Sequence, residues 1–288
     1  MDEIRALGEF GDELLICGGA YGNLEALEAL LARARALGIP PERILHTGDA
    51  AAYAADGAAG AARLTASGVH CLQGNVEQQL AEDGDDCGCG FAEGSSCDAL
   101  SASWYGHARA TVPAELRAWM GQLPLTMSFT LQGKSFLVVH GAVRRINRFM
   151  FASHDEARFQ RELARTHCQG VIAGHSGLPF TRSLGGRVWH NSGALGLPAN
   201  DGTPLVWYSV LAPVEYGIMI SQLPLDYPYR RAMDKMRQAD LAPAYAEALQ
   251  SGLWPSHDVL PAAERAMAGR ALMPRRWLWR HDGALEAH

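Results

Sequence analysis

Short apolar segments alternate with alanine-rich amphipathic segments over the first third of this 288-residue chain. Residues 13–17, 43–46 and 68–72 have the length and composition of strands, and a glycine turn follows each within two residues. Residues 23–37, between the first two, carry apolar side chains at helical spacing, and a second alanine-rich segment precedes the third strand. This alternation predicts an α/β sheet with short parallel crossovers.

The middle of the chain adds further strands, and its last quarter changes character. Residues 127–131 and 135–139 alternate around Gly133-Lys134 as in a β-hairpin, and short apolar segments follow at 170–173, 187–190 and 205–210. After residue 212, helical patterns interrupted by prolines dominate. We therefore expect a sheet domain over residues 1–212 and a C-terminal helical extension, residues 213–288, packed on it.

Composition narrows the classes of partner. A formal charge of -6 argues against nucleic acid, which usually requires a basic surface. No apolar run approaches the roughly 20 residues that span a bilayer, and the acidic start has no basic segment typical of a secretory signal. The six cysteines are too few for a disulfide scaffold. We expect a cytoplasmic protein whose partner is neither nucleic acid nor membrane, and the oligomeric state stays open.

Polar residues directly after the predicted strands are the main functional signal. Asp49, Asn75, His140 and His175 each lie next to a glycine at such a position. In an α/β sheet the carboxyl ends of the strands gather at one edge, where ligands bind. One carboxylate, one amide oxygen and two imidazoles there are a suitable ligand set for one divalent transition metal, Mn²⁺, Fe²⁺ or Zn²⁺.

These motifs, in this order, resemble those of the calcineurin-like metallophosphoesterases, in particular the small bacterial phosphodiesterase branch with diadenosine-tetraphosphatase relatives. The resemblance covers roughly residues 13–212 and rests on the stretches 19–23 (GAYGN), 48–49 (GD), 74–77 (GNVE), 140–141 (HG), 174–177 (GHSG) and 193–198 (GALGLP). It implies a four-layer sandwich of two mixed β-sheets flanked by helices. It also implies a small phosphate-containing molecule as partner.

The departures from the family pattern are concentrated in one of its two metal sites. The resemblance implies that the second metal is held by Asp49, Asn75, His140 and His175, with Asp49 and His140 central to catalysis. At the first site, Gly19, Tyr21 and Gly177 replace three of the four ligands. Val76 replaces the family's general-acid histidine, a loss that typically costs about 10²–10⁴ in rate. A one-metal centre is therefore expected.

Further residues near the motifs are candidates for catalysis or substrate binding. Glu77 is the nearest replacement acid or base, or else an exposed carboxylate in a first helical turn. Arg144 and Arg148 follow His140 in one loop and suit phosphate, or are solvated surface arginines. Tyr21 either binds substrate or fills the vacated metal site, and Asn23 contributes to substrate binding or to the backbone turn.

A glycine-rich acidic segment, residues 83–96, is predicted to be a long loop. Cys87, Cys89 and Cys97 lie in or beside it, and three thiolates could hold an additional soft metal or a redox cluster. Their spacing matches no standard zinc or cluster motif, so an incidental group of thiols is the alternative.

Three functional hypotheses remain open at this point. The first is metal-dependent hydrolysis of a small phosphate ester, diester or anhydride by an atypical one-metal enzyme. The second is a non-catalytic module that binds a metal or a phosphate-bearing ligand on the same fold. The third is metal or redox chemistry centred on the cysteine loop.

Overall fold

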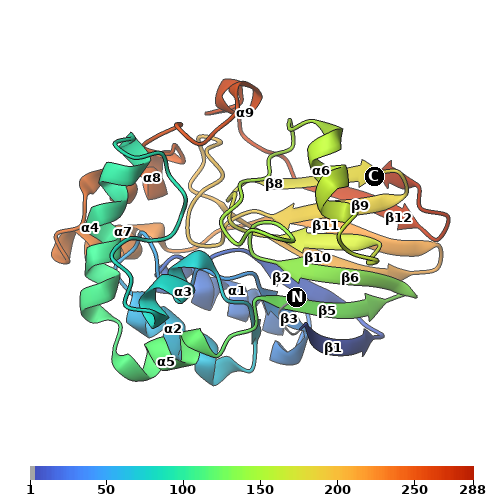
Figure 1. Ribbon diagram of the computed structural model, residues 1–288, viewed down its shortest axis with the longest axis horizontal. Helices are drawn as coiled ribbons and strands as arrows, with labels where there is room; N and C mark the ends of the chain where they lie inside the picture. The colour runs from blue at the N-terminus through green and yellow to red at the C-terminus, as the bar shows by residue number, and fades with distance from the viewer. Residues whose placement is uncertain (1–3) are drawn as a thin grey trace.

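The computed structural model describes residues 4–288, whose strands form two mixed sheets (Figure 1). The seven-stranded sheet contains, in spatial order, β13 (Leu285–Ala287), β12 (Arg275–Arg280), β11 (Gly217–Leu225), β10 (Val206–Val214), β2 (Leu14–Cys17), β3 (Ile44–His46) and β4 (His70–Cys71). The six-stranded sheet contains β1 (Arg5–Phe10), β5 (Thr126–Leu131), β6 (Lys134–Val139), β7 (Gly170–Ala173), β9 (Arg187–Ser192) and β8 (Pro179–Leu184).

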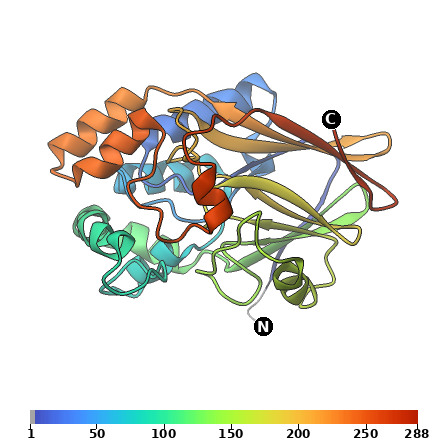
Figure 2. The same ribbon diagram turned by 90° about the horizontal axis from the view of Figure 1, so that it is seen from above.

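Helices lie on the outer faces and at one end of the two sheets, which Figure 2 shows as separate layers. They are α1 (Leu24–Ala36), α2 (Gly57–Ser67), α3 (Asn75–Ala81), α4 (Ser96–Thr111), α5 (Ala114–Gly121), α6 (Glu156–Leu163), α7 (Tyr229–Gln238), α8 (Pro243–Ser251) and α9 (Ala262–Ala266), with a 3₁₀ turn at Pro41–Arg43. In Figure 1, α2, α4, α7 and α8 lie together on the left of the molecule, and the strands extend from there towards the right.

The molecule has four layers, helix, sheet, sheet and helix, and one apolar cluster fills each of the three spaces between them. Alternate residues of the strands, such as Ile16 on β2 and Phe136 on β6, fill the space between the sheets. Leu27 of α1 packs with Leu15 on the outer face of the seven-stranded sheet, and Phe159 of α6 packs on the outer face of the other sheet. The predicted sandwich of two mixed sheets flanked by helices is confirmed.

The predicted strand ends meet at one edge because their strands run parallel. β2, β3 and β4 pair in parallel in one sheet, and β6, β7 and β9 pair in parallel in the other. The segments that follow β3, β4, β6 and β7 therefore emerge at the same end of the molecule. These segments carry Asp49, Asn75, His140 and His175.

The region expected to be a helical extension also contributes to the sheet. Residues 213–288 contain the helices α7, α8 and α9, but β11 and β12 continue the seven-stranded sheet from β10 through antiparallel pairing. β13 then pairs with β12 at the edge. The description of this region as helical was thus incomplete, because the pattern of residues 213–225 and 275–287 was not interpreted as strand.

Across residues 4–288, none of the helices combines the length and the apolar character needed to cross a membrane.

Candidate metal centre

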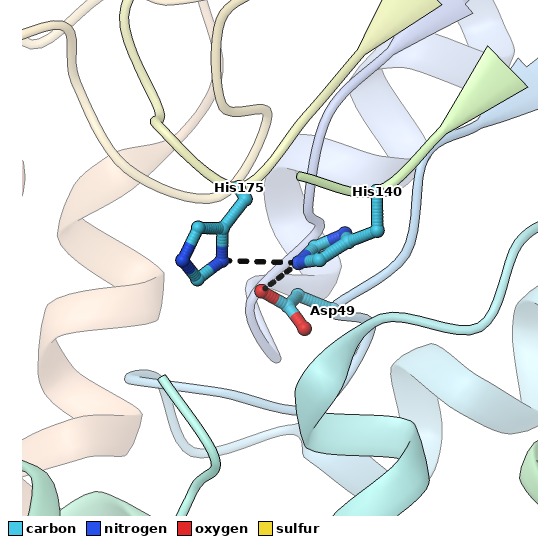
Figure 3. A group of neighbouring side chains, drawn as sticks. All are labelled: Asp49, His140 and His175. Carbon is cyan, nitrogen blue, oxygen red and sulfur yellow. Dashed lines mark hydrogen bonds and ion pairs between the residues drawn. The ribbon is translucent and has the colours of Figure 1, made fainter. Parts of the chain in front are cut away.

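Four polar side chains converge at the meeting point of the two sheets, and Figure 3 shows three of them, Asp49, His140 and His175. His140 directly follows β6, His175 lies two residues after β7, Asp49 lies in the turn after β3, and Asn75 begins α3. The Nε2 atom of His140 lies 3.1 Å from Oδ2 of Asp49, 2.9 Å from Oδ1 of Asn75 and 3.2 Å from Nδ1 of His175. All four side chains are at most 9% exposed.

The donor set fits a divalent transition metal. Nδ1 of His140 lies 2.6 Å from the carbonyl oxygen of Thr47, and because a carbonyl can only accept, this nitrogen carries the proton. The Nε2 lone pair of neutral His140 therefore faces other acceptors. Ligands about 2.1 Å from one metal stand roughly 3.0–3.4 Å apart, close to the separations observed here. Asp49, His140 and His175 also form the one group of potential metal ligands found among residues 4–288.

The protonation states of Asp49, His140 and His175 depend on one another. Burial lowers the pKa of His175 to about 3, with a further contribution from His140, so its imidazole is neutral at physiological pH. Burial alone would lower the pKa of His140, but the Asp49 carboxylate raises it overall. Burial likewise opposes ionisation of Asp49, yet His140 holds its pKa below the usual value. A neutral His175 and an ionised Asp49 are the protonation states that metal binding requires.

The backbone at two ligands adopts a conformation that is uncommon for residues other than glycine. Asp49 and His175 have φ angles of 65° and 56°, in the left-handed region. Gly48 also has positive φ, and a Cβ atom there would lie 2.8 Å from Nδ1 of His140. Strain of this kind typically collects at functional sites, where the surrounding structure maintains it.

Glu77 has neither of the two roles considered from the sequence. Its side chain is fully buried, and its carboxylate accepts hydrogen bonds from the backbone N–H groups of Gly74 (2.8 Å), Asp49 (2.7 Å) and Ala50 (2.6 Å). Burial and the nearby Asp49 raise its pKa to about 7. Because both oxygens are engaged by the backbone, Glu77 shapes the turn that presents Asp49, and its interpretation as a catalytic acid is corrected.

The cysteine loop supports the metal centre from outside. Nδ2 of Asn75 donates to the carbonyl oxygen of Cys87 at 2.8 Å and to Sγ of Cys89 at 3.3 Å, which turns Oδ1 of Asn75 towards His140. Within residues 4–288, Cys87, Cys89 and Cys97 do not form a group with metal-ligand spacing. Burial also raises the pKa of Cys89 well above its usual value, which favours the thiol in the metal-free protein. The arrangement of the three cysteines therefore does not support the predicted thiolate cluster.

Aromatic side chains occupy the region of the missing first site. Tyr21, at φ 52°, packs its ring over Gly19, where a Cβ atom would lie 2.2 Å from Cε1 of the tyrosine. A Cβ atom on Gly177 would lie 3.2 Å from Cζ2 of Trp254, which belongs to the C-terminal region. The replacements thus produce a packed apolar volume, and Tyr21 fills the space left by the absent ligand side chains.

A small pocket of about 40 Å³ adjoins this volume. Its lining includes the aromatic residues Tyr21, Tyr53, Phe149, Tyr245 and Trp254 and one of the four converging side chains, His175. Nε2 of His175 is buried and has no hydrogen-bond partner among residues 4–288. Nδ1 of the same ring faces His140, so the pocket borders the metal centre at the outer side of His175. Tyr53, Phe149 and Trp254 were missed from the sequence because aromatic residues in such positions are indistinguishable from core residues.

The other predicted substrate-binding residues have different surroundings. Asn23 is buried at the start of α1, where it accepts from Ala26 N–H and donates to the Gly196 carbonyl and the Tyr227 hydroxyl. These bonds use its amide group, so a substrate contact is not supported. Arg144 is exposed, whereas Arg148 lines a separate pocket beside Phe149.

The fold and the convergent ligand set define a metallophosphoesterase-type protein. A family model described as "Calcineurin-like phosphoesterase superfamily domain" matches residues 14–212, and the chain belongs to this superfamily. The superfamily indicates metal-dependent hydrolysis of phosphoesters as the general type of reaction. No curated protein matches the sequence significantly.

Solved structures share the fold at low sequence identity. A metallophosphoesterase from Sphaerobacter thermophilus is 19% identical, with a TM-score of 0.63 over 85% of this chain and 100% of that chain. A hypothetical protein, PH1004, from Pyrococcus horikoshii OT3 is 13% identical, with a TM-score of 0.68 over 84% of this chain and 99% of that chain. At these identities the likeness concerns the fold alone.

Proposed function

We propose that this protein hydrolyses a small phosphodiester or phosphoanhydride with one divalent transition metal, Mn²⁺, Fe²⁺ or Zn²⁺, held by Asp49, Asn75, His140 and His175. The observation that carries the proposal is the convergence of three buried ligand atoms around a fourth, Nε2 of His140, at separations typical of ligands on a shared ion. The proposed partner is a small phosphate-containing molecule in the cytoplasm, consistent with six free cysteines.

Three of the four ligand side chains, Asp49, Asn75 and His140, are held by bonds outside the centre. The Thr47 carbonyl orients His140, Val76 N–H donates to Oδ1 of Asp49 at 3.2 Å, and the cysteine loop orients Asn75. Such outer bonds fix tautomer and direction before the ion binds. When bound, the metal would supply Lewis acidity towards a phosphoryl oxygen and lower the pKa of water.

The absence of a general acid restricts the substrate. Val76, buried and apolar, stands where the family has a histidine and cannot protonate a leaving oxygen. Glu77 is held by three backbone N–H groups and cannot replace it. The reaction therefore favours leaving groups that need little protonation, such as aryl esters and phosphoanhydrides, over alkyl monoesters.

The test is hydrolysis of bis(p-nitrophenyl) phosphate by protein loaded in turn with Mn²⁺, Fe²⁺ and Zn²⁺. We expect slow, metal-dependent turnover that Asp49→Asn abolishes, with weak or no action on alkyl phosphomonoesters. Asp226→Asn, at an exposed carboxylate outside the centre, is the matched control. Inactivity of metal-loaded protein towards a broad panel of diesters and anhydrides would refute the proposal.

One observation favours a second candidate, a non-catalytic module that binds a metal or a phosphate-bearing ligand. Tyr21 and Trp254 occupy the region where the family holds its other metal, so half of the clamp on the phosphate is replaced by apolar packing. This candidate predicts stoichiometric metal binding at the same four side chains without turnover of any substrate.

A further inference from the structure

A pocket lined by arginines shares Phe149 with the aromatic pocket that borders His175. Its volume is about 370 Å³, within the usual range for small-ligand sites. Four arginines line it, Arg145, Arg148, Arg158 and Arg161, together with Asn147 and Phe149. Two of them come from the loop after His140 and two from α6, so separate elements direct positive charge at one space.

The charges in this pocket are not balanced by the protein. The buried carboxylate of Glu162 lies 3.6 Å from Nη1 of Arg148, and this is the only carboxylate of the described residues that pairs with any of the four guanidinium groups. Nη2 of Arg158 donates to the Phe149 carbonyl at 2.9 Å, but its Nε is buried and has no partner among residues 4–288. Burial, together with repulsion from Arg148 and Arg161, lowers the pKa of Arg158. A bound anion would relieve this repulsion.

The pocket is also directly connected to the metal centre. The ring of Phe149 packs against the imidazole of His175, with 4.2 Å between the ring centroids. Phe149 lines both the arginine pocket and the aromatic pocket that reaches His175. Nδ2 of Asn147 donates to the Gly88 carbonyl at 2.8 Å, which ties the arginine-bearing loop to the cysteine loop that orients Asn75. The Phe149 side chain therefore borders both sites.

We propose that the arginine pocket binds a second phosphate group of the substrate, so that the preferred substrate carries one phosphate at the metal and another at Arg145, Arg148, Arg158 and Arg161. Guanidinium groups bind phosphate through paired, charge-assisted hydrogen bonds, which suits a site built from four of them. The substrate class rests on the proposed function, but binding of an anion in the pocket does not depend on catalysis.

The first experiment measures binding of inorganic phosphate to metal-free protein by titration calorimetry. Arg145→Gln/Arg161→Gln removes two exposed guanidinium groups and leaves the bond of Arg158 to Phe149 in place. We expect it to raise Kd at least about tenfold, as for loss of a charge-assisted bond. Arg158→Gln should likewise raise the Kd for phosphate. Arg165→Gln, on an exposed arginine just beyond α6, and His140→Ala, in the metal centre, should leave the phosphate Kd unchanged.

The second experiment compares two substrates that differ by one phosphate, thymidine 5′-(p-nitrophenyl phosphate) and the same ester with a 3′-phosphate. In the parent protein the additional phosphate should lower KM about tenfold or more, with little change in kcat. Arg145→Gln/Arg161→Gln should abolish this advantage and leave kinetics on the simpler ester unchanged, because that ester has no second phosphate.

The outcomes separate the two proposals. Failure of the parent protein to bind phosphate, or equal binding by the arginine variants, would overturn the arginine pocket even if diester hydrolysis is observed. An equal KM for the two thymidine esters would overturn the assignment of the substrate class. Phosphate binding that depends on the arginines in a protein without any hydrolytic activity would support the pocket while refuting the proposed function.

Discussion

The family pattern has two metal sites, and in this protein they differ: the retained half keeps its four metal ligands, whereas the emptied half has lost three of its ligands and is filled by apolar side chains. In the retained half, Asp49, Asn75, His140 and His175 direct polar atoms at one point, and the first three are oriented by bonds from outside. In the emptied half, Tyr21 packs over Gly19, and Trp254 lies against the position of Gly177. The lost ligands have been replaced by packing, so the emptied half is a stable apolar structure.

Because of this difference, the lost metal site cannot be restored simply by returning one of its ligands. A vacated metal site that retained polar neighbours could be refilled by single substitutions. Here the space is filled by rings, including an edge-to-face pair of Tyr21 and Tyr53 with centroids 4.7 Å apart. Returning a ligand at one position would then meet a steric barrier before any metal could bind.

The largest expected effect is in the retained half. His140→Ala removes the side chain on which the other three donor atoms converge. We expect bound metal, measured by elemental analysis, to fall below about a tenth of the parent value, together with any diesterase activity. His167→Ala, at an exposed histidine, is the control. Retention of full metal content by His140→Ala would show that the metal lies elsewhere.

The next effect concerns packing in the emptied half. Gly19→Ala places a methyl group against the Tyr21 ring and should lower the free energy of unfolding by about 1–3 kcal/mol. In a Tyr21→Ala background the same substitution should cost much less. The coupling energy, from chemical denaturation of the four proteins, measures the contact.

Gly106→Ala is the matched control for this cycle. It lies in α4, a Cβ atom there would have no neighbour within 4 Å, and alanine favours helix, so the change should be neutral or slightly stabilising. Additive effects of Gly19→Ala and Tyr21→Ala would contradict the interpretation that Tyr21 fills this space.

A third effect, of similar size, involves a histidine outside both halves. Burial alone lowers the pKa of His190 to about 3, and its Nδ1 pairs with the Thr181 hydroxyl at 2.9 Å. Because the folded pKa lies below the unfolded value near 6.5, the neutral imidazole stabilises the fold fully above about pH 6.5, and this contribution is lost as pH falls towards 3. The expected loss is about 1.4 kcal/mol per pH unit.

Comparison with His190→Gln isolates this titration, since all other groups are shared. The difference in unfolding free energy between parent and variant should shift by about 1.4 kcal/mol per pH unit between pH 6 and 4, in the direction that favours the variant. Parallel stability curves for the two proteins would show that burial does not keep His190 neutral.

The sequence predicts those features of the site that depend on residues close together in the chain, and not those that depend on contacts between distant segments. Asp49 and His175 could be found because each lies within a few residues of a short apolar strand and next to a glycine. The fate of the emptied half could not be found this way, because Trp254 reaches Gly177 from a distant part of the chain. The role of Glu77 was missed for a similar reason, since two of its three bonds go to the turn after another strand.

Five strands, β1, β8, β11, β12 and β13, were not predicted, and for two of them the physical reason is clear. β1 lies at the edge of its sheet and is mostly exposed, so it lacks the alternation of apolar and polar residues that reveals a half-buried strand. β12 is recognisable only through its pairing with β11, which comes about 50 residues earlier in the chain. Both strands depend on tertiary contacts more than on their own sequence.

The smallest expected effects come from the cysteines, because Cys89 touches the retained half while Cys97 lines the aromatic pocket of the emptied half. Cys89→Ala removes one of two acceptors that orient Asn75, but the Cys87 carbonyl remains, so metal affinity should fall by less than about tenfold. Cys97→Ala should leave metal affinity unchanged. The triple replacement of Cys87, Cys89 and Cys97 by serine should still bind one metal per chain by elemental analysis, because no thiolate is a ligand. Loss of the metal from the triple variant, with its fold intact by circular dichroism, would instead make the thiols ligands and extend the metal centre beyond the four retained side chains.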